Sequence, residues 1–291
     1  MKDPRLEKLH DFRLNRTKLH KDDKILLSWN AWAVIALAKA GQALEEPSYL
    51  YAAIRIHDFI ESKMVTENDR LYLRYRDGEA AYVGQLEDYA VYALALLELY
   101  RVTFDTKYLQ TAIHRAKQMV ELFEDKKNGG YFMTAFDGEQ LIARPKETYD
   151  GAMPSGNSVA AMVLQTLASL TGERSWQAAA DRQLSFLAGE IGEYSSASCF
   201  GVLAMMDALY PHRELVCAAS DGLPGELAEY LKEHPADDLQ VLLKTRENAE
   251  TLAECAPFTK DYPIPEQGSM YYLCEGGACK APVSEFSKLK I

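Results

Sequence analysis

The apolar positions of this chain predict two alternating kinds of helix. One kind is rich in Ala and Leu and nearly uncharged, as in the run from Ala31 to Ala38. A helix that is apolar on all sides is normally buried. The other kind is amphipathic, as in 108–123, where charged residues leave one apolar face. The pattern therefore predicts buried inner helices wrapped by outer helices that are wetted on one side.

These two kinds of helix are expected to form consecutive αα-hairpins. In each outer helix an aromatic residue is followed four positions later by Ala, which places a large and a small side chain on one face. A toroid of hairpins with parallel inner helices would close such a pattern, and residues 1–212 supply about three and a half hairpins. The inner helices are expected at 28–43, 87–102, 155–170 and 198–209, and the outer helices at 49–60, 108–123 and 176–191.

The chain changes character after residue 212. Residues 215–219 and 239–243 have the composition of buried strands, and 225–234 that of a helix between them. This order predicts a βαβ appendage that, with the C-terminal tail, occupies 213–291 and packs on the toroid. Shorter strand-like inserts are expected at 71–76, which ends at an Asp-Gly pair, and in a hairpin formed by 131–134 and 140–142.

Polar, acidic loops precede the inner helices. Because parallel helices begin at the same end of a bundle, these loops should converge on one rim, with aromatic walls from Tyr72, Tyr89 and Tyr131. The loops and first turns contain Asp22, Asp23, Trp29, Asn30, Glu87, Asp88, Tyr89, Asp150, Ser155 and Asn157.

The same residues also have an ordinary structural explanation. Acids and Ser favour the positive end of a helix and cap its free N–H groups. Trp29 more commonly belongs to a core than to a sugar platform, and Gly156 suits close helix packing as well as a ligand. Arg144 and Lys146 could neutralise the acids. The convergence of several acids on one rim favours a ligand site.

The chemistry that this rim suggests is glycoside hydrolysis, which needs one protonated and one ionised carboxyl group. The candidates for these roles are Asp23, Glu87 and Asp88. The residues expected to bind substrate are Asp22, Trp29, Asn30, Tyr89, Asp150, Ser155 and Asn157. Sugar epimerisation commonly uses histidine bases, and only His20 lies near the rim, so that reaction is poorly supported.

Composition narrows the candidate partners. The chain has 291 residues, and its 43 acidic and 32 basic residues give a net charge of −11, which disfavours nucleic acid and anionic membranes. The apolar runs are too short for a membrane span, and the charged start lacks the apolar region of a signal peptide, so a cytoplasmic location is expected. The five cysteines lack zinc-ligand spacing and suggest buried or incidental thiols in a reducing compartment. Cys274 and Cys279 are close enough in sequence for a redox pair, but only Lys280 beside them would lower the pKa of a thiol. No metal or cofactor is expected.

Four motifs give the chain a family resemblance. They are Asp22–Leu26 with Ser28–Asn30, Leu86–Ala90, Pro154–Ser158, and the tail motif Tyr272–Cys274 with Ala278, Cys279 and Pro282. The chain resembles the helical carboxy-terminal part of the thioredoxin-domain-containing family of YyaL and spermatogenesis-associated protein 20. The resemblance implies a six-hairpin (α/α) toroid akin to six-hairpin glycosidases and N-acylglucosamine 2-epimerases. The chain departs from that family in lacking a match to its thioredoxin-like domain and in having too few hairpins.

Two classes of function follow from the sequence. The first is a glycosidase-like hydrolase acting on a small sugar ligand. The second is a non-catalytic ligand-binding or scaffold module that works with a thioredoxin-like domain or receives the missing hairpins in trans. An open arc of hairpins should expose the flanks of its terminal inner helices, so we expect self-association unless partner hairpins cover them.

Overall fold

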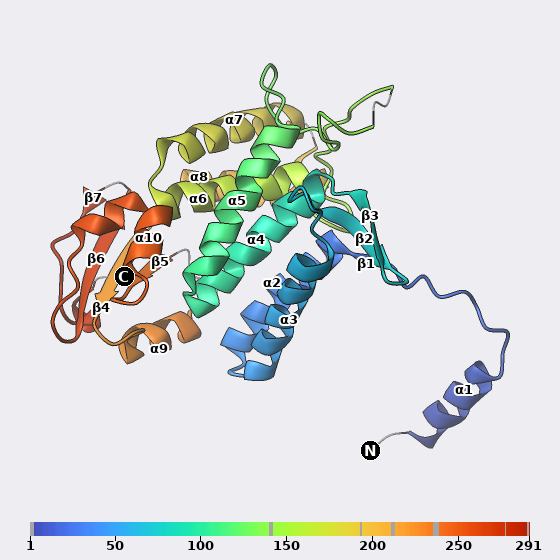
Figure 1. Ribbon diagram of the computed structural model, residues 1–291, viewed down its shortest axis with the longest axis horizontal. Coiled ribbons are helices and arrows are strands. Elements are labelled where there is room, and N and C mark those ends of the chain that lie inside the picture. The colour runs from blue at the N-terminus through green and yellow to red at the C-terminus, as the bar shows by residue number, and fades with distance from the viewer. Residues whose placement is uncertain are drawn as a thin grey trace.

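The computed structural model describes residues 3–139, 142–192, 194–210, 213–234, 239–276, 278–289 and 291. An array of helical hairpins forms the middle of the molecule, with one small sheet at each end (Figure 1). This arrangement confirms the expected mainly α fold of toroid type with a small C-terminal βαβ unit.

Three hairpins and one further inner helix make up the array. Each helix lies within a few residues of its expected range, so the alternation of uncharged and amphipathic segments was a sound guide. The hairpins are α2 (Leu27–Ala43) with α3 (Pro47–Lys63), α4 (Leu86–Thr103) with α5 (Thr106–Phe123), and α6 (Gly156–Thr171) with α7 (Arg174–Ile191), followed by α8 (Cys199–Leu209).

Burial differs between inner and outer helices as the sequence pattern requires. The inner helix α4 is buried along most of its length from Leu86 to Tyr100. Its outer partner α5 buries one face, which includes Leu109 and Met119, and leaves the opposite face in water. An uncharged helix can be enclosed without stranding charges, whereas an amphipathic one needs solvent on its polar side. This difference fixes which helix of each hairpin lies inside.

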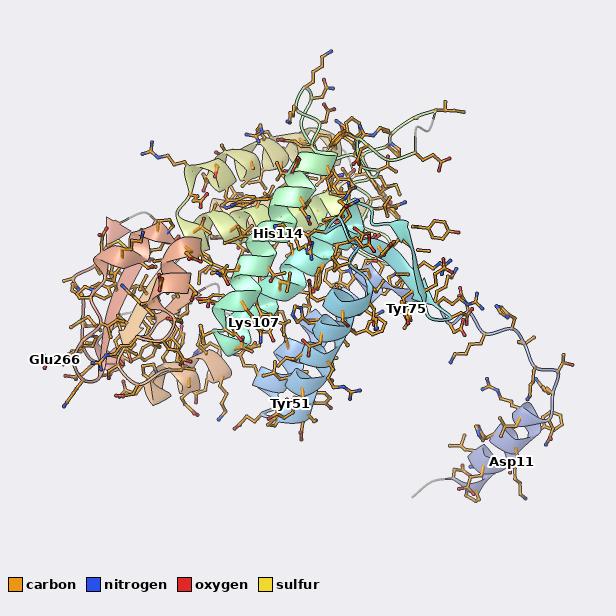
Figure 2. The ribbon with its side chains drawn as sticks, viewed as in Figure 1. Asp11, Tyr51, Tyr75, Lys107, His114 and Glu266 are labelled. Carbon is orange, nitrogen blue, oxygen red and sulfur yellow. A yellow bond between two sulfur atoms is a disulfide. The ribbon has the colours of Figure 1, made fainter. Side chains whose placement is uncertain are left out.

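The N-terminal part contains one helix that the sequence analysis did not anticipate. Helix α1 (Pro4–Leu14) buries none of its residues and lies apart from the body, as the labelled Asp11 shows (Figures 1 and 2). A small antiparallel sheet follows, made of β1 (Ile25–Leu26), β2 (Tyr72–Arg76) and β3 (Glu79–Val83). Its central strand confirms the strand expected at 71–76.

The other expected insert is different. Residue Tyr131 forms only an isolated bridge with Glu124, in place of a regular strand over 131–134. The expected partner segment includes Gln140 and Leu141, which lie outside the described residues.

The C-terminal unit contains the expected βαβ element. Strands β4 (Arg213–Ala219) and β5 (Gln240–Lys244) are parallel and are joined through α9 (Gly225–Glu233). Two unanticipated strands extend the sheet on the other side of β4 in the order β5-β4-β6-β7. The tail also forms one short helix. These additional elements are β6 (Ser269–Glu275), β7 (Ala278–Cys279) and α10 (Ala249–Cys255).

The C-terminal unit contacts the helical array at the end opposite the three-stranded sheet. Glu214 at the start of β4 accepts a hydrogen bond of 3.1 Å from Ser169, near the end of α6. Thr251 in α10 lies 3.0 Å from Thr106 at the start of α5, between hydroxyl oxygens. Glu266 marks the far side of this unit in Figure 2. The opposite end of the array, where the inner helices begin, is therefore left for the candidate site.

The cysteines depart in part from the expectation of buried or incidental thiols. Cys274 and Cys279 form a disulfide, while Cys217 and Cys255 are buried thiols and Cys199 is an exposed one. In the described parts of the chain, no helix is long and apolar enough to span a bilayer.

Candidate functional site

The inner helices begin side by side, and Asp88 joins the first two of them. One carboxylate oxygen of Asp88 accepts a hydrogen bond of 3.2 Å from the Ser28 amide at the start of α2. The other accepts one of 2.8 Å from the Gln85 amide, which closes a capping box on α4. Both acceptors of this buried carboxylate are therefore directed at helix N–H groups, so Asp88 acts as a clamp between two helix starts.

Asp150 plays the same part between α6 and α8. Its first carboxylate oxygen accepts a 2.7 Å hydrogen bond from the Ser155 amide, at the start of α6. Its second oxygen accepts hydrogen bonds of 2.7 and 3.0 Å from the amides of Phe200 and Gly201 in the first turn of α8. The positive end of α8 thus receives a carboxylate from a preceding loop. The structural alternative considered from the sequence describes Asp88 and Asp150 well.

Burial changes the proton affinity of the two adjacent acids at the start of α4. Removal from water raises the pKa of Asp88 to about 7, because the charged form loses its hydration and the carboxylate of Glu87 lies nearby. Burial also raises the pKa of Glu87, which a hydrogen bond from the Ser28 side chain partly offsets. Glu87 is only partly buried, so it combines a raised pKa with access to solvent.

Asn157 is fully buried, and its amide is engaged on all sides. Its oxygen accepts hydrogen bonds from the Tyr131 amide (2.8 Å) and from Gln183 (3.1 Å). Its nitrogen donates to the carbonyls of Tyr131 and Glu147, each at 2.9 Å. Asn157 therefore fastens two loop segments and α7 to the start of α6, and it is not open to solvent.

Ser155 is the N-cap of α6. Its hydroxyl oxygen accepts a hydrogen bond of 3.2 Å from the Ser158 amide, and the residue is buried. This geometry is the ordinary capping arrangement that the sequence allowed as an alternative to ligand binding.

Gly156 allows α6 to approach α4 closely. A Cβ atom at this position would lie 2.8 Å from Leu86 Cγ and 3.1 Å from the backbone nitrogen of Glu87. Of the two explanations for this glycine, the structure favours close helix packing over contact with a ligand.

We expect Gly156→Ala to lower the free energy of unfolding by about 1–3 kcal/mol, because the added methyl group must push α4 and α6 apart. The matched control is Gly189→Ala in α7, where nothing lies within 4 Å of the added Cβ. Gly189→Ala should raise the free energy of unfolding by about 0.5–1 kcal/mol, because alanine reduces the backbone freedom of the unfolded chain. Urea unfolding measures both, and equal effects of the two substitutions would contradict this account.

The residues before and within the first turn of α2 are more accessible. Asp23 forms an ion pair of 2.8 Å with Arg76 of β2, and its side chain is 49% exposed. Trp29 is 61% exposed. Asn30 donates a hydrogen bond of 2.8 Å to the Leu26 carbonyl at the helix start. The exposed Asp22 contacts Lys24, whose amide lowers the pKa of that carboxyl.

The expected aromatic walls lie mainly in the core. Tyr89 is completely buried against Phe123, and its hydroxyl oxygen accepts hydrogen bonds from Arg70 and the Leu71 amide. Tyr131 is 2% exposed. Tyr89 therefore supports the site from within and is not a surface for a ligand. The sheet itself packs on α3 through Tyr75 and Phe59, whose ring centroids are 5.2 Å apart (Figure 2).

The structure thus divides the ten sequence-derived residues into two groups. The first group holds helix starts and loops together, and its members are the buried Asp88, Tyr89, Ser155 and Asn157 and the half-buried Asp150. The residues that remain open to a ligand are Asp22, Asp23, Trp29, Asn30 and Glu87.

Ser28 and Arg76 were not expected as site residues. The Ser28 side chain hydrogen-bonds Glu87 and its amide hydrogen-bonds Asp88. Arg76 forms an ion pair with Asp23. Their signal was positional, since Ser28 lies in the first acidic motif and Arg76 directly precedes an Asp-Gly turn.

A cavity of about 420 Å³ lies elsewhere, between the outer helices α5 and α7. Its described lining includes Lys117, Trp176 and Arg182, and none of the ten site residues is among that lining. In the described regions, no three His, Cys, Asp or Glu side chains are grouped in a way that could hold a metal ion.

Comparison with known proteins supports the resemblance found in the sequence, although no protein-family model matches the chain. Spermatogenesis-associated protein 20 of Mus musculus is 35% identical over 181 residues, covering 59% of this chain and 23% of that protein. The Homo sapiens protein is 27% identical over 301 aligned residues, covering 98% of this chain and 38% of that protein. The chain therefore spans less than half the length of these relatives.

Solved structures confirm the fold. A family 76 α-mannanase of Bacteroides thetaiotaomicron has a TM-score of 0.52 at 19% identity, covering 66% of this chain and 55% of that one. A cellobiose 2-epimerase of Bacillus thermoamylovorans has a TM-score of 0.52 at 12% identity, covering 90% and 68%. The chain is thus a homologue of spermatogenesis-associated protein 20, with the hairpin-toroid fold of these glycosidase-like proteins.

Proposed function

We propose that the open part of the rim is a carbohydrate site in which Glu87 is the general acid. The observation that carries this proposal is the position of Glu87 in the first turn of α4, partly buried and with a raised pKa. Burial favours the protonated form of Glu87, and a protonated carboxyl group can donate its proton to the leaving oxygen of a glycosidic bond. Asp88 beside it is enclosed and engaged with two amides, so it supports Glu87 and does not meet substrate.

Asp23 is the proposed second carboxylate. Its ion pair with Arg76 holds it at the edge of the three-stranded sheet, and half of its side chain remains exposed. Trp29 offers an exposed aromatic face one residue after Ser28, which itself hydrogen-bonds Glu87. Aromatic faces suit the apolar side of a sugar ring, so Trp29 is the proposed platform, with Asp22 and Asn30 as further polar contacts.

The fold is shared with proteins that are named for carbohydrate substrates. The structural neighbours named above are an α-mannanase and a cellobiose 2-epimerase. Their identity to this chain is too low to transfer a reaction, so the proposal rests on the residues of the rim.

The test is hydrolysis of α-mannan oligosaccharides and cellobiose by the full chain, followed by reducing-sugar release. We expect Glu87→Gln to lower turnover by about 100-fold or more, because the amide cannot donate the proton. The control is Glu67→Gln at an exposed loop position, which should leave turnover unchanged. Absence of both binding and hydrolysis in the wild-type chain across this panel would reject the enzyme proposal.

A second candidate function is a non-catalytic module that joins further helical hairpins, together with a thioredoxin-like domain. The observation that favours it is the outward face of α8, where Leu203, Met206, Leu209 and Tyr210 are 53%, 45%, 81% and 64% exposed. Helix α8 occupies an inner position, and the described part of the chain provides it with no outer helix. Continuation of the hairpin pattern, supplied in trans or by a longer polypeptide, is the occupant that matches this apolar face.

If that face is open in the isolated chain, it should promote self-association. We expect Leu203→Glu to shift the sedimentation profile toward monomer, because a charge at the centre of an apolar contact must be desolvated there. The control Leu6→Glu lies on the detached α1, where leucine is 62% exposed, and should not shift the profile. A monomeric wild-type chain at all concentrations would show that this face needs no partner.

A further inference from the structure

The Cys274–Cys279 disulfide lies at the outer edge of the C-terminal sheet. It connects β6 to β7, the two-residue strand that ends the sheet order β5-β4-β6-β7. Cys274 is partly buried, and Cys279 is exposed. Since β7 is an edge strand, a second molecule can approach Cys279 without displacing the sheet.

The fold gains less from this bond than it would from one that closes a long loop. This bond closes a loop with a sequence separation of 5, and short loops give the smallest gain in chain entropy from a cross-link. The strand it fastens is also held by the Lys280 amide, which donates a hydrogen bond of 2.9 Å to the Leu273 carbonyl.

The tail that follows has its own attachments. Tyr271 and Val283 exchange two backbone hydrogen bonds of 2.8 and 3.1 Å. The ring of Phe286 packs on that of Tyr271, with their centroids 5.5 Å apart. Opening the disulfide therefore leaves the tail fixed to the sheet.

The other cysteines show the contrast. Burial raises the pKa of Cys217 to about 12 and that of Cys255 to about 11, so both stay protonated and enclosed. Exposed disulfides with little structural function are the ones that exchange readily with other thiols. The Cys274–Cys279 disulfide, which is exposed at Cys279, meets both conditions among the described cysteines.

We propose that Cys274 and Cys279 form a redox site that exchanges with the dithiol of a partner protein, independently of the rim site. A thiolate of the partner bonds to Sγ of Cys279, the bond between Cys279 and Cys274 breaks, and Cys274 leaves as a thiolate that takes up a proton. The second thiol of the partner then attacks the mixed disulfide and releases Cys279. The partner dithiol is oxidised by two electrons, and the cysteine pair is reduced.

The first test uses the full chain carrying Cys199→Ser, which removes the exposed free thiol. Dithiothreitol should reduce one disulfide per chain in the folded state, as counted by alkylation and mass spectrometry. The reduction rate should stay constant as urea is raised below the unfolding transition, and the circular dichroism spectrum should not change. A rate that rises in parallel with global unfolding would identify a structural disulfide and overturn the proposal.

The second test asks which sulfur is attacked. With Cys199→Ser retained, Cys274→Ser leaves Cys279 as the exposed thiol among the described cysteines, and Cys279→Ser leaves the partly buried Cys274. We expect the first variant to react with 5,5′-dithiobis(2-nitrobenzoate) at least roughly tenfold faster, because access governs the rate. A thioredoxin with its second active-site cysteine changed to serine should likewise be trapped on Cys279 of the intact disulfide. Equal rates, or trapping on Cys274, would overturn the assignment of Cys279.

Discussion

Asn157→Ala is expected to lower the free energy of unfolding by about 3–5 kcal/mol. The alanine cannot replace the hydrogen bonds that Asn157 makes to Tyr131, Glu147 and Gln183. Asn157, Tyr131 and Gln183 are buried, and each buried polar group left unpaired costs about 1–3 kcal/mol. Water entering the vacated space would recover part of this loss, so the expected value is less than the sum.

Urea unfolding measures this effect, with Asn15→Ala as the control. Asn15 follows α1, is exposed, and makes one side-chain hydrogen bond of 2.9 Å to the Asp11 carbonyl. Its replacement should change stability by less than about 0.5 kcal/mol, as surface substitutions usually do. If both asparagines gave the same small effect, Asn157 would be free of its structural role and available to a ligand.

The helical array could be predicted because its signal is repeated and local. A largely apolar helix such as α4 is favourable only in the interior. The amphipathic helix α5 has one apolar face for the core and one polar face for solvent. Short loops then force consecutive helices to be antiparallel neighbours.

Other elements carried weaker signals. In helix α1 charged residues lie between the leucines, and none of its residues is buried against a core, so its sequence has no clear amphipathic pattern. Strand β6 is stabilised by pairing with β4, which lies about 50 to 60 residues earlier in the chain. Such pairings depend on contacts distant in sequence, so local periodicity did not reveal them.

The site was predicted in place but not in detail. The sequence put acids at the helix starts, yet it could not show the direction of each side chain. Glu87 and Asp88 are adjacent on α4, and both contact Ser28 of α2, but successive positions around the helix bury Asp88 and leave Glu87 partly accessible. The same uncertainty concealed the role of Asp150, whose partners in α8 lie about 50 residues away.

The buried carboxyl of Asp88 should make stability depend on pH. Its pKa is about 7 in the folded chain against 3.8 for the ordinary group, chiefly because of burial. Between these values the folded state binds more protons than the unfolded state, so the contribution of Asp88 to stability falls as pH rises and levels off above pH 7. The full difference corresponds to about 4 kcal/mol.

Asp88→Asn removes this ionisation while keeping the size of the side chain. The variant should be less stable than wild type at the acid end, because the amide oxygen replaces only one of the two acceptors bound by Ser28 and Gln85. As pH rises toward 7, the free energy of unfolding of wild type should fall relative to that of the variant by up to about 1.4 kcal/mol per pH unit. Urea unfolding across pH 4–8 measures both curves, with Asp77→Asn at an exposed turn as the control that should run parallel to wild type. Parallel curves for Asp88→Asn as well would mean that this carboxyl is hydrated in solution, and the clamp between α2 and α4 would then have to be open to water.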